Sequence, residues 1–156
     1  MRSPRLSLLL LALALVMAAC GPVPGLRPLG SAIEASDPSL GVDTLVSIGT
    51  GVAGHRQVQW RPIAALQPLL PLHLDRPDAR PLQVSVDAGG QRLVVLRERK
   101  GQTELVLHDR RLGISRPLPL AADGLPVAIG LSADGRSLAV AVSRDGRRRI
   151  EVLALP

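Results

Sequence analysis

The 156-residue sequence has very little aromatic content: it contains no Phe or Tyr and a single Trp, Trp60. Proteins that bind single-stranded nucleic acid rely on base stacking against aromatic side chains, so this scarcity argues against a nucleic-acid partner. Lysine is equally scarce, because eighteen of the nineteen basic residues are Arg. The formal net charge is +6, and without Arg2 and Arg5, which lie in the expected leader, it falls to about +4, an ordinary balance.

Cysteine is almost absent as well. Cys20 is the only cysteine, so no intramolecular disulfide can form. The longest apolar run covers residues 6–17 only, whereas a membrane-spanning helix needs about 20 residues. Two arginines precede this run and small residues follow it. The pattern is typical of a cleaved secretory signal and excludes a permanent span in this segment.

The residues around the cysteine read Met17-Ala18-Ala19-Cys20. They resemble the bacterial lipobox, in which two small residues precede an invariant cysteine, and Met17 departs from the usual Leu. The resemblance implies removal of residues 1–19, attachment of diacylglycerol to the Cys20 thiol and acylation of the new amine. Two or three acyl chains make attachment lasting, because a single chain anchors only marginally. The alternative is an ordinary signal peptide cut after Ala18 or Ala19, which would leave Cys20 near a free terminus.

A stretch rich in proline and glycine follows the cysteine through residue 41. Its prolines disfavour both a helix and a strand ladder, and no apolar period is visible. We therefore expect residues 20–41 to form a flexible tether. Gly21 rather than Asp follows the cysteine, which by resemblance to enterobacterial sorting favours the periplasmic face of the outer membrane over retention at the inner membrane.

The remainder, residues 42–156, contains an internal repeat with an offset of 45 residues. Residues 81–108 align with residues 126–153 without a gap. The identical positions are Pro81/Pro126, Ala88/Ala133, Gly90/Gly135, Leu93/Leu138, Val95/Val140, Arg99/Arg144 and Gly101/Gly146. Apolar residues alternate with smaller or polar ones in both copies, and this alternation predicts strands that each bury one face.

Turn residues separate these expected strands. The pairs are Gly89-Gly90 with Asp134-Gly135, and Lys100-Gly101 with Asp145-Gly146. Asp-Gly between alternating apolar runs is a strong hairpin signal, because glycine accepts the positive φ of tight turns. We also expect a strand around 116–120, and a degenerate third hairpin over 43–60 with strands at 45–48 and 57–60.

A period near 45 residues with four short strands is typical of a β-propeller blade. Residues 131–155 resemble a blade of the TolB-like propellers, whose pattern is Ser-x-Asp-Gly-x-x-Leu-Ala followed by Ser-Arg-Asp-Gly. The matching positions are Ser132, Asp134, Gly135, Leu138, Ala139, Ser143, Arg144, Asp145 and Gly146. The first copy departs from this pattern, with Asp87 and Glu98 in place of the two serines. The resemblance covers residues 81–156.

The expected fold is all-β. Residues 42–156 give room for about two and a half blades, whereas closed propellers use roughly 4 to 8. We therefore expect two to three antiparallel β-meanders in an incomplete or open propeller. An open sheet, a ring completed by oligomerisation, and a small stack of sheets that borrows the repeat all fit this length.

A glycine motif, Gly-x-Gly-x-x-Gly, occupies residues 49–54. Dinucleotide binding would require a helix to begin there and an acidic residue about 20 positions on, where Asp75 has the right spacing. Residues 55–60 are β-like and prolines follow them. We therefore interpret the motif as a hairpin loop and expect no cofactor.

The remaining candidates for catalysis are scattered. His55, His73 and His108 have no metal-ligand spacing, and Ser132 and Ser143 have no evident base. No catalytic residue or metal site is predicted, and the chain is not expected to be an enzyme. The cluster formed by Arg144 and residues 147–149 is interpreted as a solvated hairpin in preference to a site for anionic lipid, glycan phosphate or an acidic partner.

Two function classes follow. The first is a non-catalytic, lipid-anchored interaction or scaffolding protein of the periplasm, which the TolB resemblance implies, with an unidentified envelope protein as partner. The second is a small-ligand or glycan binder, or less favourably a hydrolase, built on the repeat loops. Self-association fits both classes.

Overall fold

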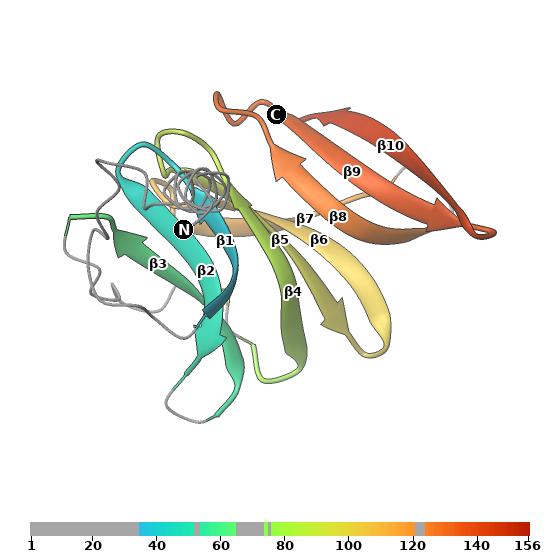
Figure 1. The fold of residues 1–156 in the computed structure, drawn as a ribbon, viewed down its shortest axis with the longest axis horizontal. Coiled ribbons are helices and arrows are strands. Elements are labelled where there is room, and N and C mark those ends of the chain that lie inside the picture. Colours follow the sequence, from blue (N-terminus) through green and yellow to red (C-terminus); the bar gives the residue numbers. More distant parts are fainter. Residues whose placement is uncertain (1–34, 52–53, 65–73, 75, 121–123) are drawn as a thin grey trace, which may run out of the picture. The chain divides into compact units, whose positions relative to one another are not determined.

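The structure is a computed structural model that describes residues 35–51, 54–64, 74, 76–120 and 124–156. These residues form ten strands in three antiparallel sheets (Figure 1). The first sheet contains β1 (Ala35–Leu40), β2 (Thr44–Thr50) and β3 (Arg56–Pro62). The second contains β4 (Ala79–Val86), β5 (Arg92–Arg99), β6 (Gln102–Asp109) and β7 (Ile114–Leu118). The third contains β8 (Leu125–Leu131), β9 (Ser137–Arg144) and β10 (Arg147–Ala154).

The internal repeat of the sequence is a repeat of the structure. Strands β9 and β10 begin 45 residues after β5 and β6. The inner strands β4 and β8 even share an irregularity in register, between Pro81 and Gln83 in one and between Pro126 and Ala128 in the other. The prediction of an all-β, incomplete propeller is therefore confirmed. In the described ranges, no helix has the length and apolar character needed to cross a membrane.

The expected third hairpin is also present, as β2 and β3 of the first sheet. The extra strand expected around 116–120 is β7, which begins two residues earlier at Ile114 and pairs with β6. Propeller-like meanders thus account for all three sheets.

One expectation needs correction at the amino-terminal boundary of the folded part. The tether was expected to extend through residue 41, but Ala35–Leu40 is strand β1 and pairs with β2. Pro38 is tolerated because β1 lies at the edge of its sheet, and the register shifts between Ser36 and Ser39. Asp37 takes a φ of 51° at this bulge.

Two apolar clusters hold the sheets together, and the second sheet contributes to both. The first cluster comprises Val46, Ile48, Val58, Trp60, Leu74, Val84, Val86, Leu93, Val95 and Val106. The second comprises Val94, Leu96, Leu105, Leu107, Leu138, Val140, Val142 and Leu155. Successive residues of β5 alternate between the two clusters, so the continuous apolar run of residues 93–96 is buried on both faces. Figure 1 shows the second sheet between the other two.

The predicted turn residues occupy turns. Lys100 and Gly101 both have positive φ, and so do Asp145 and Gly146. These two-residue connections therefore have the backbone twist that matches a pair of antiparallel strands. Gly89 lies in the β4–β5 turn and Asp134 in the β8–β9 turn, and the glycines that follow them, Gly90 and Gly135, also have positive φ.

Candidate interaction surfaces

Backbone hydrogen bonds join the β1–β2, β4–β5 and β8–β9 turns of neighbouring sheets. The Val42 amide of the first sheet donates to the Ala88 carbonyl at 2.8 Å. The Ala88 amide in turn donates to the Ala133 carbonyl at 3.0 Å. Ala88 and Ala133 are equivalent positions of the repeat, so the same backbone link recurs at both junctions.

Serine side chains provide a second recurring link, which we call the serine clasp. Ser39 of β1 accepts a hydrogen bond from the Val86 amide of β4 at 3.0 Å. Ser85 of β4 accepts one from the Leu131 amide of β8 at 2.8 Å. At the equivalent position, 45 residues after Ser85, the third sheet has Gly130, which has no side-chain acceptor. The clasp therefore joins only the first sheet to the second and the second to the third.

The β4–β5 and β8–β9 turns reach the same geometry with different side chains. In the second sheet, Asp87 accepts from the amides of Gln91 and Arg92 at 2.8 and 3.0 Å. In the third sheet the equivalent Ser132 accepts from the Ser137 amide at 2.9 Å and donates to Asp134 at 2.5 Å. The Ser132 hydroxyl and the Arg136 amide, both donating to the Asp134 carboxylate, lower its pKa. Asp87 thus does alone what a Ser–Asp pair does in the TolB-like pattern.

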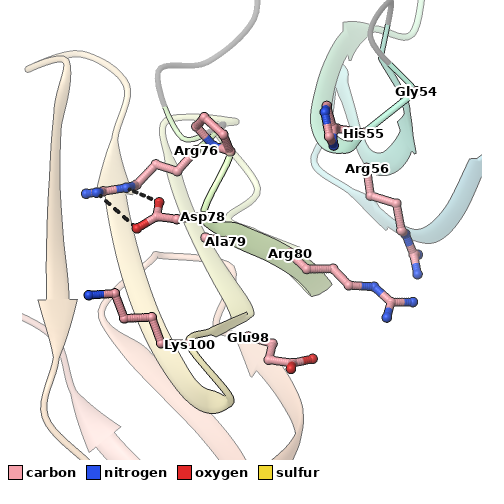
Figure 2. Close-up of a pocket in the computed structure, with 10 residues that line it drawn as sticks. Gly54, His55, Arg56, Arg76, Asp78, Ala79, Arg80, Glu98 and Lys100 are labelled. Carbon is pink, nitrogen blue, oxygen red and sulfur yellow. Dashed lines mark hydrogen bonds and ion pairs between the residues drawn. The ribbon is translucent and has the colours of Figure 1, made fainter.

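A cleft of about 420 Å³ lies between the β2–β3 connection and the start of β4 (Figure 2). The first sheet contributes Gly54, His55 and Arg56. The segment leading into β4 contributes residues 76–78, the second sheet contributes Ala79, Arg80 and Glu98, and its β5–β6 turn contributes Lys100. Polar and charged side chains dominate this lining, so the cleft suits a polar or anionic group better than an apolar ligand.

Ion pairing fixes part of the cleft. Asp78 pairs with Arg76 and Arg99, each at 2.9 Å. Hydrogen bonds from Arg76 and Arg99 lower the pKa of Asp78 to about 2. Arg56 donates to Ser36 at 2.7 Å. Figure 2 shows the side chains of Arg56 and Arg80 extending to the same side of the cleft.

A second hollow, of about 380 Å³, lies at the tip of the β9–β10 hairpin and is lined by Arg144, Asp145, Arg147 and Arg149. Arg144 and Arg147 are directly opposite in the strand register, an arrangement that costs stability because like charges face each other. Asp145 lies 3.8 Å from Arg144. The hairpin tip is therefore an arginine-rich surface that folding alone does not favour.

The structure separates the three histidines. His55 lies at the cleft, and His73 lies outside the described residues. His108 is buried, and its Nδ1 lies 2.8 Å from the Ser115 hydroxyl on the neighbouring strand β7. Ser132 accepts a hydrogen bond in the β8–β9 turn, and Ser143 is the residue before the last in β9. Within the described ranges, no three His, Cys, Asp or Glu side chains are grouped as metal ligands.

The glycine motif of residues 49–54 spans the end of β2 and the connection to β3, which begins at Arg56. A strand follows the motif where a dinucleotide site requires a helix, so the hairpin interpretation is confirmed. Asp75 lies outside the described residues. So do the signal segment 1–19 and the lipobox residues Met17, Ala18, Ala19 and Cys20, whose roles remain predictions.

Sequence reasoning missed the surroundings of Trp60. Its ring is buried between the first and second sheets, and the Arg110 guanidinium lies over it, 3.6 Å from the ring centroid. Arg110 is in the β6–β7 turn, fifty residues further along the chain. The pairing depends on how two sheets pack, so no local pattern signals it.

No protein-family model matches the chain, and no curated protein matches its sequence. Solved structures do match its fold. TolB from Acinetobacter baumannii superposes with a TM-score of 0.60 at 16% identity, covering 81% of this chain and 31% of that one. A protein assigned as TolB from Agrobacterium tumefaciens gives 0.57 at 16%, covering 72% and 39%.

The β-propeller domain of the Trilobed protease from Pyrococcus furiosus, described as having an open velcro topology, gives a TM-score of 0.55 at 14% identity, covering 78% of this chain and 38% of that one. The chain thus spans about a third of the length of the TolB structure from Acinetobacter. The chain has a TolB-like β-propeller fold, present as three open sheets.

Proposed function

We propose that the chain is a non-catalytic, lipid-anchored protein of the cell envelope that binds another envelope protein. The binding surface is the end of the sheets that carries the β2–β3, β5–β6 and β9–β10 connections, which we call the hairpin side. The observation that carries this proposal is a cationic surface, formed by Arg80 and Lys100 at the cleft and by the arginines of the β9–β10 hairpin tip, beside the β2–β3, β5–β6 and β9–β10 connections. Figure 1 shows these three connections on the same side of the sheets. Exposed guanidinium groups there are suited to bidentate contacts with carboxylates, so an acidic protein surface is the expected partner.

The charge of this side supports the proposal. Among the described residues, Arg56, Arg76, Arg80 and Lys100 line the cleft with only two carboxylates. Asp78 is engaged by two arginines, and Glu98 lies opposite Arg80 in the strand register. At the third hairpin, a single carboxylate, Asp145, lies among the arginines that line the hollow. This excess of cations would speed encounter with an acidic partner, and the effect would weaken with salt.

Affinity capture from detergent-solubilised envelopes tests the partner. The native chain should retain a reproducible acidic envelope protein, and the double variant Arg80→Glu/Lys100→Glu should lose most of it. Arg111→Glu is the matched control, because Arg111 is equally exposed but lies in the β6–β7 turn, at the opposite end of β6. Equal capture by all three proteins would remove the hairpin side as the binding surface.

The proposed anchor rests on the sequence around Cys20, through a thioether to diacylglycerol in an outer-membrane leaflet facing the periplasm. Labelled palmitate should enter the native chain, which should sediment with membranes. Cys20→Ser should abolish both results. A Cys20→Ser variant that still incorporated palmitate would overturn the anchor, and mass measurement of the mature N-terminus would locate the cleavage site.

A second candidate function is binding of a small anionic ligand or glycan, which the cleft at Arg56 and Arg80 favours. Inorganic phosphate is a suitable probe, because it presents the anionic oxygens that arginines recognise. Saturable shifts of the His55 ring signals on titration with phosphate, lost in Arg80→Glu, would support it. Unchanged signals at millimolar phosphate would exclude this use of the cleft.

A further inference from the structure

Strand β10 is at the edge of the third sheet, whose order is β10-β9-β8. Its equivalent in the second sheet, β6, is not at an edge, because β7 pairs with residues 105–109. Residues 150–154 are the equivalent part of β10. In the part of the chain that the structure describes, no strand covers that side of β10.

The uncovered segment is also apolar and exposed. Ile150 is 75% exposed and Val152 is 70% exposed, whereas the equivalent Leu105 and Leu107 are 0% and 1% exposed. Leu105 and Leu107 are buried because the third sheet packs on that face of β6, so Ile150 and Val152 lie on the corresponding uncovered face, beside the open edge. An edge of this kind is a site at which another strand can add. Such a strand would bury part of this surface and satisfy the open backbone groups.

The hairpin geometry defines which backbone groups are open. The two-residue turn makes Arg144 and Arg147 the pair that closes the hairpin, so the amide and carbonyl of Arg147 point toward β9. Alternation along the strand then directs the amides and carbonyls of Arg148, Ile150, Val152 and Ala154 away from β9. Four residues thus offer both a donor and an acceptor to an incoming strand.

We propose that β10 pairs antiparallel with β10 of a second copy of this chain, about a two-fold axis at Ile150. In this register the two copies of Ile150 form a hydrogen-bonded pair. Arg149 then lies opposite Glu151 of the partner subunit, and the same contact is repeated by symmetry. These charges occupy non-hydrogen-bonded positions, where opposite side chains are closest, at about 4.5–5.5 Å between Cβ atoms.

The same register keeps like charges apart. Arg148 lies opposite Val152 of the partner subunit, so its own symmetry copy is four residues away, or about 14 Å along the strand. That separation exceeds the screening length of about 8–10 Å at ordinary salt. The sequence Arg149-Ile150-Glu151 is therefore self-complementary, and it favours a second copy over an unrelated strand.

A closed propeller ring completed by several copies of the chain is a less suitable arrangement than β10–β10 pairing. It would pack the third sheet of one copy on the outward face of the first sheet of another, where Gln57 and Gln59 alternate with the buried Val58 and Trp60. That face is polar, as is usual for the terminal unit of a repeat array. Gly130 also removes the serine clasp from such a junction.

A charge exchange tests the pairing. The full chain in detergent should form a dimer, as measured by analytical ultracentrifugation. Arg149→Glu and Glu151→Arg should each weaken association by about tenfold or more, because each places like charges opposite one another twice. The double variant Arg149→Glu/Glu151→Arg should restore the native association. Arg144→Glu, a similar change at the hairpin tip, should leave it intact.

Cross-linking tests the register. On a Cys20→Ser background, Ile150→Cys should form an intermolecular disulfide under mild oxidation, because hydrogen-bonded pairs have Cα atoms about 5.5 Å apart. Ala154→Cys, on the same edge, should not cross-link, since residue 154 would lie opposite residue 146. A monomeric native chain, a dimer indifferent to both single charge reversals, or preferential cross-linking at residue 154 would each overturn the proposal.

Discussion

Gly41 lies where the backbones of the first and second sheets approach each other closely. A Cβ placed on Gly41 would be 2.8 Å from the Asp87 carbonyl oxygen and 3.0 Å from that of Ala88. Both atoms belong to the backbone and cannot move away cheaply. Gly41→Ala should therefore destabilise the protein by about 1–3 kcal/mol, measured by urea unfolding with Trp60 fluorescence.

Gly130 is the matched control, because a Cβ there would meet nothing within 4 Å. Gly130→Ala should be neutral, or stabilising by up to about 1 kcal/mol, since alanine restricts the unfolded chain. Equal effects of the two substitutions would show that the close approach at Gly41 does not limit packing between the sheets.

Asp78 should make stability depend on pH at the acidic end. Its pKa is lowered to about 2 from 3.8 by Arg76 and Arg99. The carboxylate therefore contributes stability that is fully present above its unfolded pKa and is lost as the pH falls from about 4 towards 2. Asp78→Asn should reduce the dependence of the urea unfolding midpoint on pH in this window, and Arg99→Gln should reduce it in part. An unchanged slope in Asp78→Asn would contradict the assignment.

Residue patterns predicted the turns better than the bonds within them. Gly101 and Gly146 were identified because positive φ leaves a strong local signature in sequence. The role of Asp87 was not, since its replacement of the usual serine looked like a departure from the pattern. Its carboxylate accepts two turn amides, which becomes evident only once the β4–β5 turn is closed.

At the scale of elements, the serine clasp should determine how firmly the inner strands hold together. Ser85→Ala removes the acceptor of the Leu131 amide, and Ser85 is 8% exposed. The unpartnered amide should cost about 1–3 kcal/mol. Hydrogen exchange of the Leu131 amide should accelerate, while Ser39→Ala should accelerate that of Val86 instead.

Ser143→Ala provides the control for this experiment, because Ser143 is a half-exposed serine of β9 outside the clasp. It should leave exchange at Leu131 and Val86 unchanged. If Ser85→Ala also left Leu131 exchange at the native rate, the hydroxyl would be a neighbour of that amide without stabilising it.

Strand assignment succeeded where apolar alternation was regular and failed where it was not. Strands β4, β8 and β9 follow from alternation, and the Gly turns separate β5 from β6 and β9 from β10. Strand β1 was expected to be tether, because its sequence ASDPSL contains a proline and one large apolar residue. Pairing with β2 overrides those weak propensities, and pairing is a long-range interaction that a short window does not contain.

At the scale of the whole molecule, sequence arithmetic predicted how many sheets the chain can build, but not how they are coupled. The repeat gave the offset and the approximate number of blades. The two faces of the second sheet, and the charged cleft between the first and second sheets, depend on packing between segments far apart in sequence. His55 and Lys100 both line this cleft, and no rule of sequence spacing relates the two residues.

Because the second sheet contributes to both apolar clusters, the three sheets should unfold as one unit. Leu138 of β9 is fully buried in the cluster shared by the second and third sheets, and Leu138→Ala should cost about 2–5 kcal/mol. Trp60 belongs to the other cluster, so its fluorescence reports on the first and second sheets. A cooperative protein should show the full loss of stability in the Trp60 signal, and circular dichroism should give the same midpoint.

Leu125→Ala, at a residue 55% exposed on β8, is the control and should shift neither midpoint appreciably. If Leu138→Ala lowered the circular dichroism midpoint while the Trp60 transition stayed in place, the third sheet would unfold independently, as nearest-neighbour repeats can. The apolar run of β5 argues for the cooperative outcome, because losing the third sheet exposes Val94 and Leu96, which lie on the same strand as Leu93 and Val95.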